Sequence, residues 1–304
     1  MATEPTDNPL EDGSGGVLVR AIGGAQTIRL IAADTSGMVE TLRTTHDCGP
    51  LGTMAIGRVA SAAILLSATL KDRQQIGFQI NGDGPLREAY AIADAGGRVR
   101  ATISSPRAEP TGDELKVGSG FGQGRLSVTR QLTDEAPYRG IVQLVTGEVA
   151  EDLAHYLHTS EQIPSAVSLG EILDSSGVVA AGGLLVQALP GAEDSVLGPL
   201  IERIESLPPI SEYFAGGGTP TALVSGLMDD VEILEKRAVN FVCPCTREQF
   251  ARRLCTIGED ELRKLTESLE ETVVECHFCR TEYTFDKEQI GALLYGARMY
   301  DEAD

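Results

Sequence analysis

The sequence predicts an α+β protein, in which a mostly antiparallel sheet packed with helices precedes a helical linker and a small C-terminal domain. Three observations carry this prediction. Strand-like and helix-like segments interleave through about residue 190, with meander turns between several of the strands. Amphipathic helical patterns broken by Pro and Gly follow over 191–239. Beyond residue 240 the chain carries two close pairs of cysteines.

The composition is that of a globular protein with an acidic surface. The chain has 304 residues, a formal charge of −20 and a pI near 4.6. This charge repels phosphate backbones and anionic lipid, so we expect neither nucleic acid nor membrane as a partner. Residues 1–15 are acidic and rich in Pro and Gly, which predicts a disordered tail and no export signal. We therefore expect a reducing compartment.

The N-terminal α+β domain is expected over 16–190. The glycine-rich stretch 118–125 does not fit the GxGxxG spacing of nucleotide-binding loops, and we interpret it as a loop between strands. Periodicity and turn signals predict the other elements: two strands over 17–33, two helices over 35–70, a three-stranded meander over 75–103, a strand over 138–147, a helix over 147–162, and one or two strands over 177–192.

The segment 191–239 is expected to be a helical linker. Leu197, Leu200, Ile204 and Leu207 recur at helical spacing before Pro208 and Pro209 break the pattern. Helical character resumes after "AGGGTP", in "ALVSGLMDDVEILEKR". Two interpretations remain open: a helical subdomain packed on the sheet, or a hinge with a movable apolar face. The pattern alone favours the packed subdomain.

The segment 240–295 concentrates the chemistry of the chain. Its cysteines form a CxC pair and a CxxC pair separated by thirty residues, which is how a chain wraps four thiolates around one tetrahedral zinc ion. The segment is near the lower size limit for a fold held by its core alone. A structural zinc contributes roughly 10–16 kcal/mol to the folding of such units. The predicted ligands are Cys243, Cys245, Cys276 and Cys279.

The same thiolates are also a target for oxidants. Oxidation can link Cys243 to Cys245 and Cys276 to Cys279, and a sulfur in a disulfide no longer serves as a thiolate ligand. The ring closed by a CxC disulfide is very small, and strain makes such a bond easier to reduce again. The four residues can therefore serve both as a zinc site and as a reversible redox switch.

Other candidate ligands and enzyme motifs are weaker. His277 lies inside the CxxC, but four cysteines already complete a ligand set. Cys48 has no partner in the pattern, and Cys255 is expected to be buried on a helix. His155 and His158 are not part of an HExxH motif, and the chain has no GxSxG or P-loop. We predict that the protein is not an enzyme.

Two alternative functions remain open at this level. The first is a zinc-ribbon binding module with a purely structural metal. Such modules need basic surface to bind nucleic acid, whereas residues 240–304 carry eight Lys or Arg and fourteen Asp or Glu, a net charge of −6. The second is a thiol oxidoreductase, which needs an exposed CxxC at a helix N-terminus.

From about residue 16 to 295 the chain resembles the heat-shock protein 33 family of redox-regulated chaperones. The resemblance rests on the CxC and CxxC pairs with "CTREQFARRL" and "FCRTEYTFD" around them, and on "AIGRVASAAILLSATLK", "INGDGPL", "YLHTSEQIPSAVSLG" and "GGLLVQALPGA". It implies an ATP-independent holdase of the bacterial cytoplasm that binds unfolded client proteins.

The resemblance also implies how the holdase is regulated. Zinc would keep the reduced chaperone inactive, while the disulfides Cys243–Cys245 and Cys276–Cys279 would release zinc, loosen the linker and yield active homodimers. It implies an N-terminal domain over 16–190, a linker over 191–239 and a zinc-binding redox-switch domain over 240–295. We expect an acidic tail over 296–304. Cys48 and Cys255 depart from the family pattern, but neither departure removes a predicted zinc ligand.

Overall fold

The structure, a computed structural model, describes residues 15–301 except 72, 111, 113, 132–135 and 269. The chain divides between Val242 and Cys243 into an N-terminal and a C-terminal compact unit. The predicted tail over 1–15 lies outside the described residues apart from Gly15, as do residues 302–304 of the predicted C-terminal tail.

Two sheets form the framework of the N-terminal unit. A five-stranded antiparallel sheet has the order β10-β1-β2-β9-β8. Its strands are β1 (Val17–Gly23), β2 (Ile28–Asp34), β8 (Ser165–Asp174), β9 (Gly177–Ala188) and β10 (Glu232–Ala238). The α+β class with mostly antiparallel pairing is confirmed, but the strands are shared between two sheets.

The second sheet has six strands in the order β11-β5-β4-β3-β6-β7. All neighbours in it are antiparallel except β11, which runs parallel to β5. Its strands are β3 (Gln75–Gly82), β4 (Glu88–Asp94), β5 (Arg98–Ile103), β6 (Gly124–Gln131), β7 (Tyr138–Gln143) and β11 (Asn240–Phe241).

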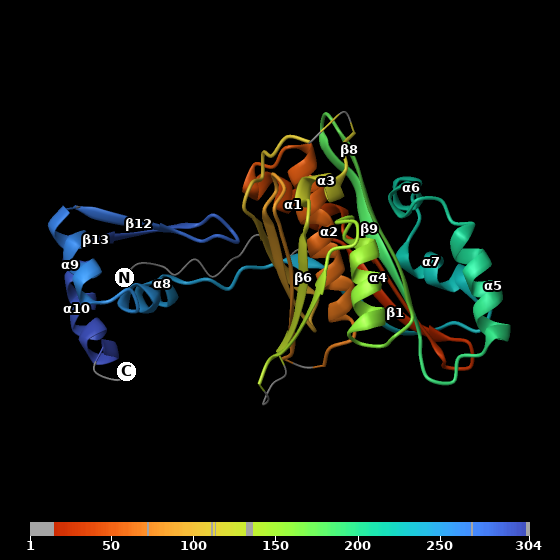
Figure 1. Cartoon of the computed structure of the whole chain (residues 1–304). Coiled ribbons are helices and arrows are strands. Elements are labelled where there is room, and N and C mark those ends of the chain that lie inside the picture. The colour runs from red at the N-terminus through yellow and green to blue at the C-terminus, as the bar shows by residue number, and fades with distance from the viewer. Residues whose placement is uncertain are drawn as a thin grey trace. The chain divides into compact units, whose positions relative to one another are not determined.

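Helices α1 (Ser36–His46), α2 (Pro50–Ser67) and α4 (Ala150–Thr159) pack between the two sheets, and each contacts strands of both (Figure 1). Pro50 is the first residue of α2, a position whose N–H has no hydrogen-bond partner within a helix, so the lack of this N–H in proline costs nothing. By length and composition α2 passes the test for a membrane-crossing helix, but 83% of it is buried inside the protein. We therefore assign α2 as the central core helix.

Three helices of the predicted linker cover the other face of the five-stranded sheet (Figure 1). They are α5 (Asp194–Glu205), α6 (Ile210–Ala215) and α7 (Pro220–Leu227), separated at the predicted Pro and Gly breakers. The prediction of helix is wrong over 232–238, where β10 pairs with the open edge of β1. Pairing satisfies the edge hydrogen bonds of β1, and this long-range gain overrides the local helical pattern.

The C-terminal unit is a hairpin packed with three helices. Its core contains Phe250, Leu254, Leu262, Phe285 and Ile290. The elements are α8 (Arg247–Cys255), α9 (Glu259–Ser268), β12 (Glu271–Glu275), β13 (Glu282–Asp286) and α10 (Lys287–Asp301). Helix α10 continues through residues 296–301 of the predicted acidic tail.

The glycine-rich stretch differs from the predicted loop. It forms the short helix α3 (Val117–Phe121) and then the start of β6. A Cβ placed on Gly82 would come within 1.9 Å of the Phe121 carbonyl oxygen, and one on Gly120 within 2.5 Å of Leu86. Close packing of α3 on the strands therefore explains these glycines without a bound nucleotide.

Candidate metal centre

Four thiols of the C-terminal unit gather into one cluster. Their Sγ atoms all lie within 4.8 Å of one another. The separation is 3.7 Å between the sulfurs of Cys243 and Cys276, and 3.3 Å between those of Cys245 and Cys279. Each close contact therefore joins one sulfur of the CxC to one sulfur of the CxxC, and all four sulfurs can ligate a single ion.

The CxC pair lies on the extended segment between β11 and α8. Thr246 follows it directly and caps α8: its hydroxyl accepts the Gln249 N–H at 3.3 Å, while the Gln249 side chain accepts the Thr246 N–H at 3.3 Å. This capping box fixes where the helix begins and hence the direction in which the chain leaves Cys245.

The CxxC pair lies in the tight turn that joins β12 to β13. The Cys276 N–H donates to the Thr281 carbonyl at 2.9 Å, and the Arg280 N–H donates to the Cys276 carbonyl at 2.8 Å. Arg280 adopts a left-handed φ of 60°, which reverses the chain within the turn. The backbone thus brings Cys276 and Cys279 to the cluster before any metal is considered.

Two hydroxyl groups contact the cluster. The Tyr283 hydroxyl lies 3.2 Å from the Cys245 sulfur and donates to the Cys245 carbonyl at 3.0 Å. The Thr281 hydroxyl lies 3.2 Å from the Cys279 sulfur. Sequence reasoning missed both residues, although their place just after the CxxC, in "CRTEY", was an available signal.

Burial and hydrogen bonding shift the pKa values of the cluster thiols in opposite directions. Burial raises the pKa of Cys243, and it raises the pKa of Cys245 to about 11. Burial also acts to raise the pKa of Cys279, but hydrogen bonds from the side chain and backbone of Thr281 outweigh it and the pKa falls. Cys243 and Cys245 would therefore be neutral at pH 7 without a positive ion beside them.

The remaining candidates lie apart from the cluster. Cys48 is buried in the turn between α1 and α2, where burial raises its pKa to about 12. Cys255 is buried in α8, and its thiol faces the Leu293 carbonyl at 3.7 Å. His155 and His158 lie on α4 of the N-terminal unit. His277 lies in the CxxC turn but is not among the gathered groups, which are cysteines alone.

The donor set fits a soft divalent ion. Four thiolates from two close pairs satisfy the tetrahedral coordination of structural zinc sites and leave no position open for a substrate. Cys276 is only 4% exposed and belongs to the core of the unit, against which the other three cysteines also pack. A metal ion held by these cysteines would therefore stabilise the same small fold as the core packing.

Comparisons with known proteins agree with this geometry. The sequence model of a family described as "Hsp33 protein" matches residues 16–286. The chain is 40% identical over 284 residues to the 33 kDa chaperonin of Desulforamulus reducens, covering 91% of this chain and 96% of that one. It is 41% identical over 282 residues to the 33 kDa chaperonin of Geobacter sulfurreducens, covering 91% and 94%.

A solved structure is similar over the same extent. The crystal structure of the 33 kDa chaperonin (heat shock protein 33 homolog) from Thermotoga maritima matches with a TM-score of 0.86 and 30% sequence identity. The match covers 95% of this chain and all of that chain.

Proposed function

This chain belongs to the Hsp33 protein family, and from that premise we propose that it is a redox-regulated holdase that binds unfolded client proteins without ATP. The observation that carries the proposal is the cluster of four sulfur atoms within 4.8 Å in a unit with a small core. We further propose that it acts in the cytoplasm, is not an enzyme, and is a homodimer in its active form.

In the reduced state we assign the ligands of one zinc ion to Cys243, Cys245, Cys276 and Cys279. Bound there, zinc holds the CxC segment against the β12–β13 turn and keeps the thiols ionised. Thr246 and Arg280 fix the backbone on either side of the site. The metal thereby maintains the order of the C-terminal unit.

Oxidation acts on the ligand set itself. A disulfide between Cys243 and Cys245, and another between Cys276 and Cys279, removes all four thiolates that the ion requires. The unit then loses the stabilisation by metal, and its core of a few apolar side chains is too small to replace it.

The surface offered to clients is the face of the five-stranded sheet under α5–α7. Phe214 of α6 and Leu223 of α7 are buried there, on a sheet face that includes Leu30 and Leu184. The Phe214 ring packs directly on Gly182, where an added Cβ would come within 2.3 Å of the ring. Detachment of these helices exposes a broad apolar face, which is the chemistry that binds unfolded chains.

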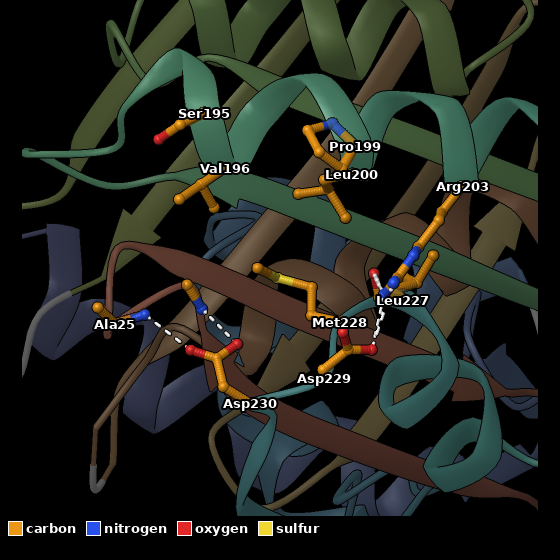
Figure 2. Close-up of a pocket in the computed structure, with 11 residues that line it drawn as sticks. Ala25, Ser195, Val196, Pro199, Leu200, Arg203, Leu227, Met228, Asp229 and Asp230 are labelled. Carbon is orange, nitrogen blue, oxygen red and sulfur yellow. Dashed lines mark hydrogen bonds and ion pairs between the residues drawn. The ribbon is translucent and has the colours of Figure 1, made fainter.

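Polar contacts hold the end of this helical segment (Figure 2). The Asp230 carboxylate accepts hydrogen bonds from the N–H groups of Gly24 and Ala25, at 3.0 and 2.9 Å, in the left-handed turn between β1 and β2. Arg203 of α5 pairs with Asp229 at 3.2 Å and donates to the Leu227 carbonyl at 3.0 Å. These groups are exposed or half-buried, so they stabilise the docked segment only slightly. The free energy needed to release the segment is therefore small.

The proposal is tested by measuring zinc and free thiols together with chaperone activity. Peroxide treatment of the reduced, zinc-loaded chain is expected to remove four thiols, release the metal and switch on suppression of client aggregation. Equal protection of a thermally unfolding client by the reduced and oxidised forms would contradict the redox switch. Retention of zinc through oxidation would instead support a metal site with a purely structural role.

A further inference from the structure

Each cysteine pair has one sulfur that contacts a side-chain hydroxyl. In the CxC it is Cys245, with Tyr283 at 3.2 Å, and in the CxxC it is Cys279, with Thr281 at 3.2 Å. We infer that these two hydroxyls restrain the oxidation of the cluster, one hydroxyl for each pair. The inference rests on the proposed zinc-bound, oxidisable cluster and assigns positioning residues to it.

The geometry gives each hydroxyl a separate task. The Tyr283 hydroxyl has one proton and two acceptors within reach, the Cys245 sulfur and the Cys245 carbonyl. A metal-held thiolate at Cys245 is the stronger acceptor of the two, so with the ion bound the hydroxyl donates to the sulfur. The ring is held for this contact by Phe250, whose centroid lies 4.9 Å from that of Tyr283.

Thr281 contacts Cys279 through two groups. Its backbone N–H donates to the Cys279 sulfur, and the Cys279 thiol donates to its hydroxyl at 3.2 Å. With a metal ion bound, the sulfur has no proton to donate, and the hydroxyl donates to it instead. Replacing the side chain removes only the hydroxyl and leaves the backbone bond, which belongs to the turn itself. The two hydroxyls reach different sulfurs from opposite ends of the sequence "TEY", so each can be removed without touching the other.

The effect of the hydroxyls on oxidation depends on the nucleophilicity of sulfur, because sulfur is the attacking atom. In reaction with a peroxide, a thiolate forms an S–O bond while the O–O bond breaks and hydroxide leaves. The second thiolate of the pair then forms the S–S bond as the S–O bond breaks, and hydroxide leaves again. Two sulfurs lose two electrons in total, the peroxide gains them, and two protons from solvent convert the hydroxides to water.

Hydrogen bonding to a thiolate withdraws charge from sulfur and lowers its nucleophilicity. Each hydroxyl therefore slows the reaction of its own pair.

The test uses the full-length, zinc-loaded and reduced chain with four variants. Tyr283→Phe keeps the ring and loses the hydroxyl, and Thr281→Val keeps the shape and loses the hydroxyl. Thr281→Ser restores a hydroxyl at that position. Thr256→Val is the matched control, because the Thr256 hydroxyl bonds to the Arg253 carbonyl at 2.8 Å at the end of α8.

Initial rates of disulfide formation under hydrogen peroxide are measured pair by pair, by differential alkylation and peptide mass spectrometry. Initial rates are needed because loss of either pair destroys the ligand set and exposes the other pair. Tyr283→Phe is expected to speed the Cys243–Cys245 pair roughly three- to ten-fold and Thr281→Val the Cys276–Cys279 pair by a similar factor, each leaving the other pair unchanged. Thr281→Ser and Thr256→Val should behave as the unmodified chain.

Three results would overturn or limit the inference. Acceleration of both pairs alike in each variant means that the hydroxyls merely hold the fold together, and it overturns the inference. Unchanged rates in both variants also overturn it, while leaving the proposed function intact if the unmodified chain binds zinc and forms both disulfides. If the unmodified chain does neither, the proposed function fails together with the inference. Zinc content before oxidation is measured in every variant, because loss of such supporting contacts typically weakens metal binding about 10- to 100-fold.

Discussion

Replacement of Glu171 by Gln is expected to remove most of the pH dependence of stability that arises in the core of the N-terminal unit. Glu171 lies on β8 with its side chain 1% exposed, and its Oε2 accepts from Arg58 Nε of α2 at 3.0 Å. Arg58 also pairs with Glu148, and in the described part of the chain Glu171 Oε1 accepts no hydrogen bond. One arginine thus serves two carboxylates in a buried site.

The pKa of Glu171 sets the size of the effect. Burial raises it from 4.5 to about 7, although Arg58 opposes the rise. Because the folded state holds the proton more tightly, this residue's contribution to stability is complete below about pH 4.5 and is lost as pH rises through about 7. A shift of about 2.5 units corresponds to roughly 3 kcal/mol over the full range, and to roughly 2 to 3 kcal/mol between pH 5 and pH 8.

The assay is urea unfolding of both proteins, reduced and zinc-loaded, at several values between pH 5 and pH 8. The difference in unfolding free energy is compared, so that titrations shared by the two chains cancel. Glu171→Gln mimics the protonated side chain and should become more stable relative to the unmodified chain by roughly 2 to 3 kcal/mol as pH rises. A difference that stays constant over this range would refute the assignment. Asp174→Asn is the control, because Asp174 lies on the same strand but is exposed. This variant should not gain stability relative to the unmodified chain as pH rises.

Three further predictions concern the metal and the helical segment. Chelation of zinc from the reduced chain should abolish amide protection in β12, β13 and α8 and spare the two sheets of the N-terminal unit, as read by hydrogen exchange. Phe214→Ala should cost roughly 3 to 5 kcal/mol of packing for α6 and raise client protection by the reduced chain, measured as suppressed aggregation. Asp230→Ala should increase proteolytic cleavage within 194–238, since the N–H groups of Gly24 and Ala25 lose their acceptor; unchanged cleavage would contradict that role.

Local signals predicted the elements that depend on local physics. Pro50 marks the start of α2, and the breakers at Pro208 and Gly216 separate α5, α6 and α7. Hydrophobic periodicity and turn-forming residues act over a few neighbouring positions, so they can be recognised in a single sequence. The four thiols were identified for the same reason, because each pair is close in sequence and the residue type restricts its chemistry.

What sequence did not reveal depends on distant partners. The strand β10 exists because β1, some two hundred residues earlier, has an unpaired edge at Val17–Ile22. The strand β8 gave no clear alternation because Gly170 and Ser168 stand beside larger residues, and its place is fixed by β9. The hydroxyls of Tyr283 and Thr281 gain meaning only when the turn brings them to the sulfurs.

The strand that ends the helical segment and the cysteine cluster are linked along the chain by very few residues. After β10 the chain adds β11 to the edge of β5, and the last hydrogen bond to that sheet is donated by the Val242 N–H to the Val99 carbonyl at 2.9 Å. Cys243, a proposed ligand, is the next residue.

The short strand β11 therefore connects the C-terminal unit to β10, the strand that follows the α5–α7 segment. With only two paired residues it resists little, so loss of order beyond Cys243 can fray β11 and then β10, whose outer edge carries the exposed Ile233 and Leu234. Such fraying would carry a redox event at four sulfurs to the helices that cover the apolar sheet face without a direct contact between the two.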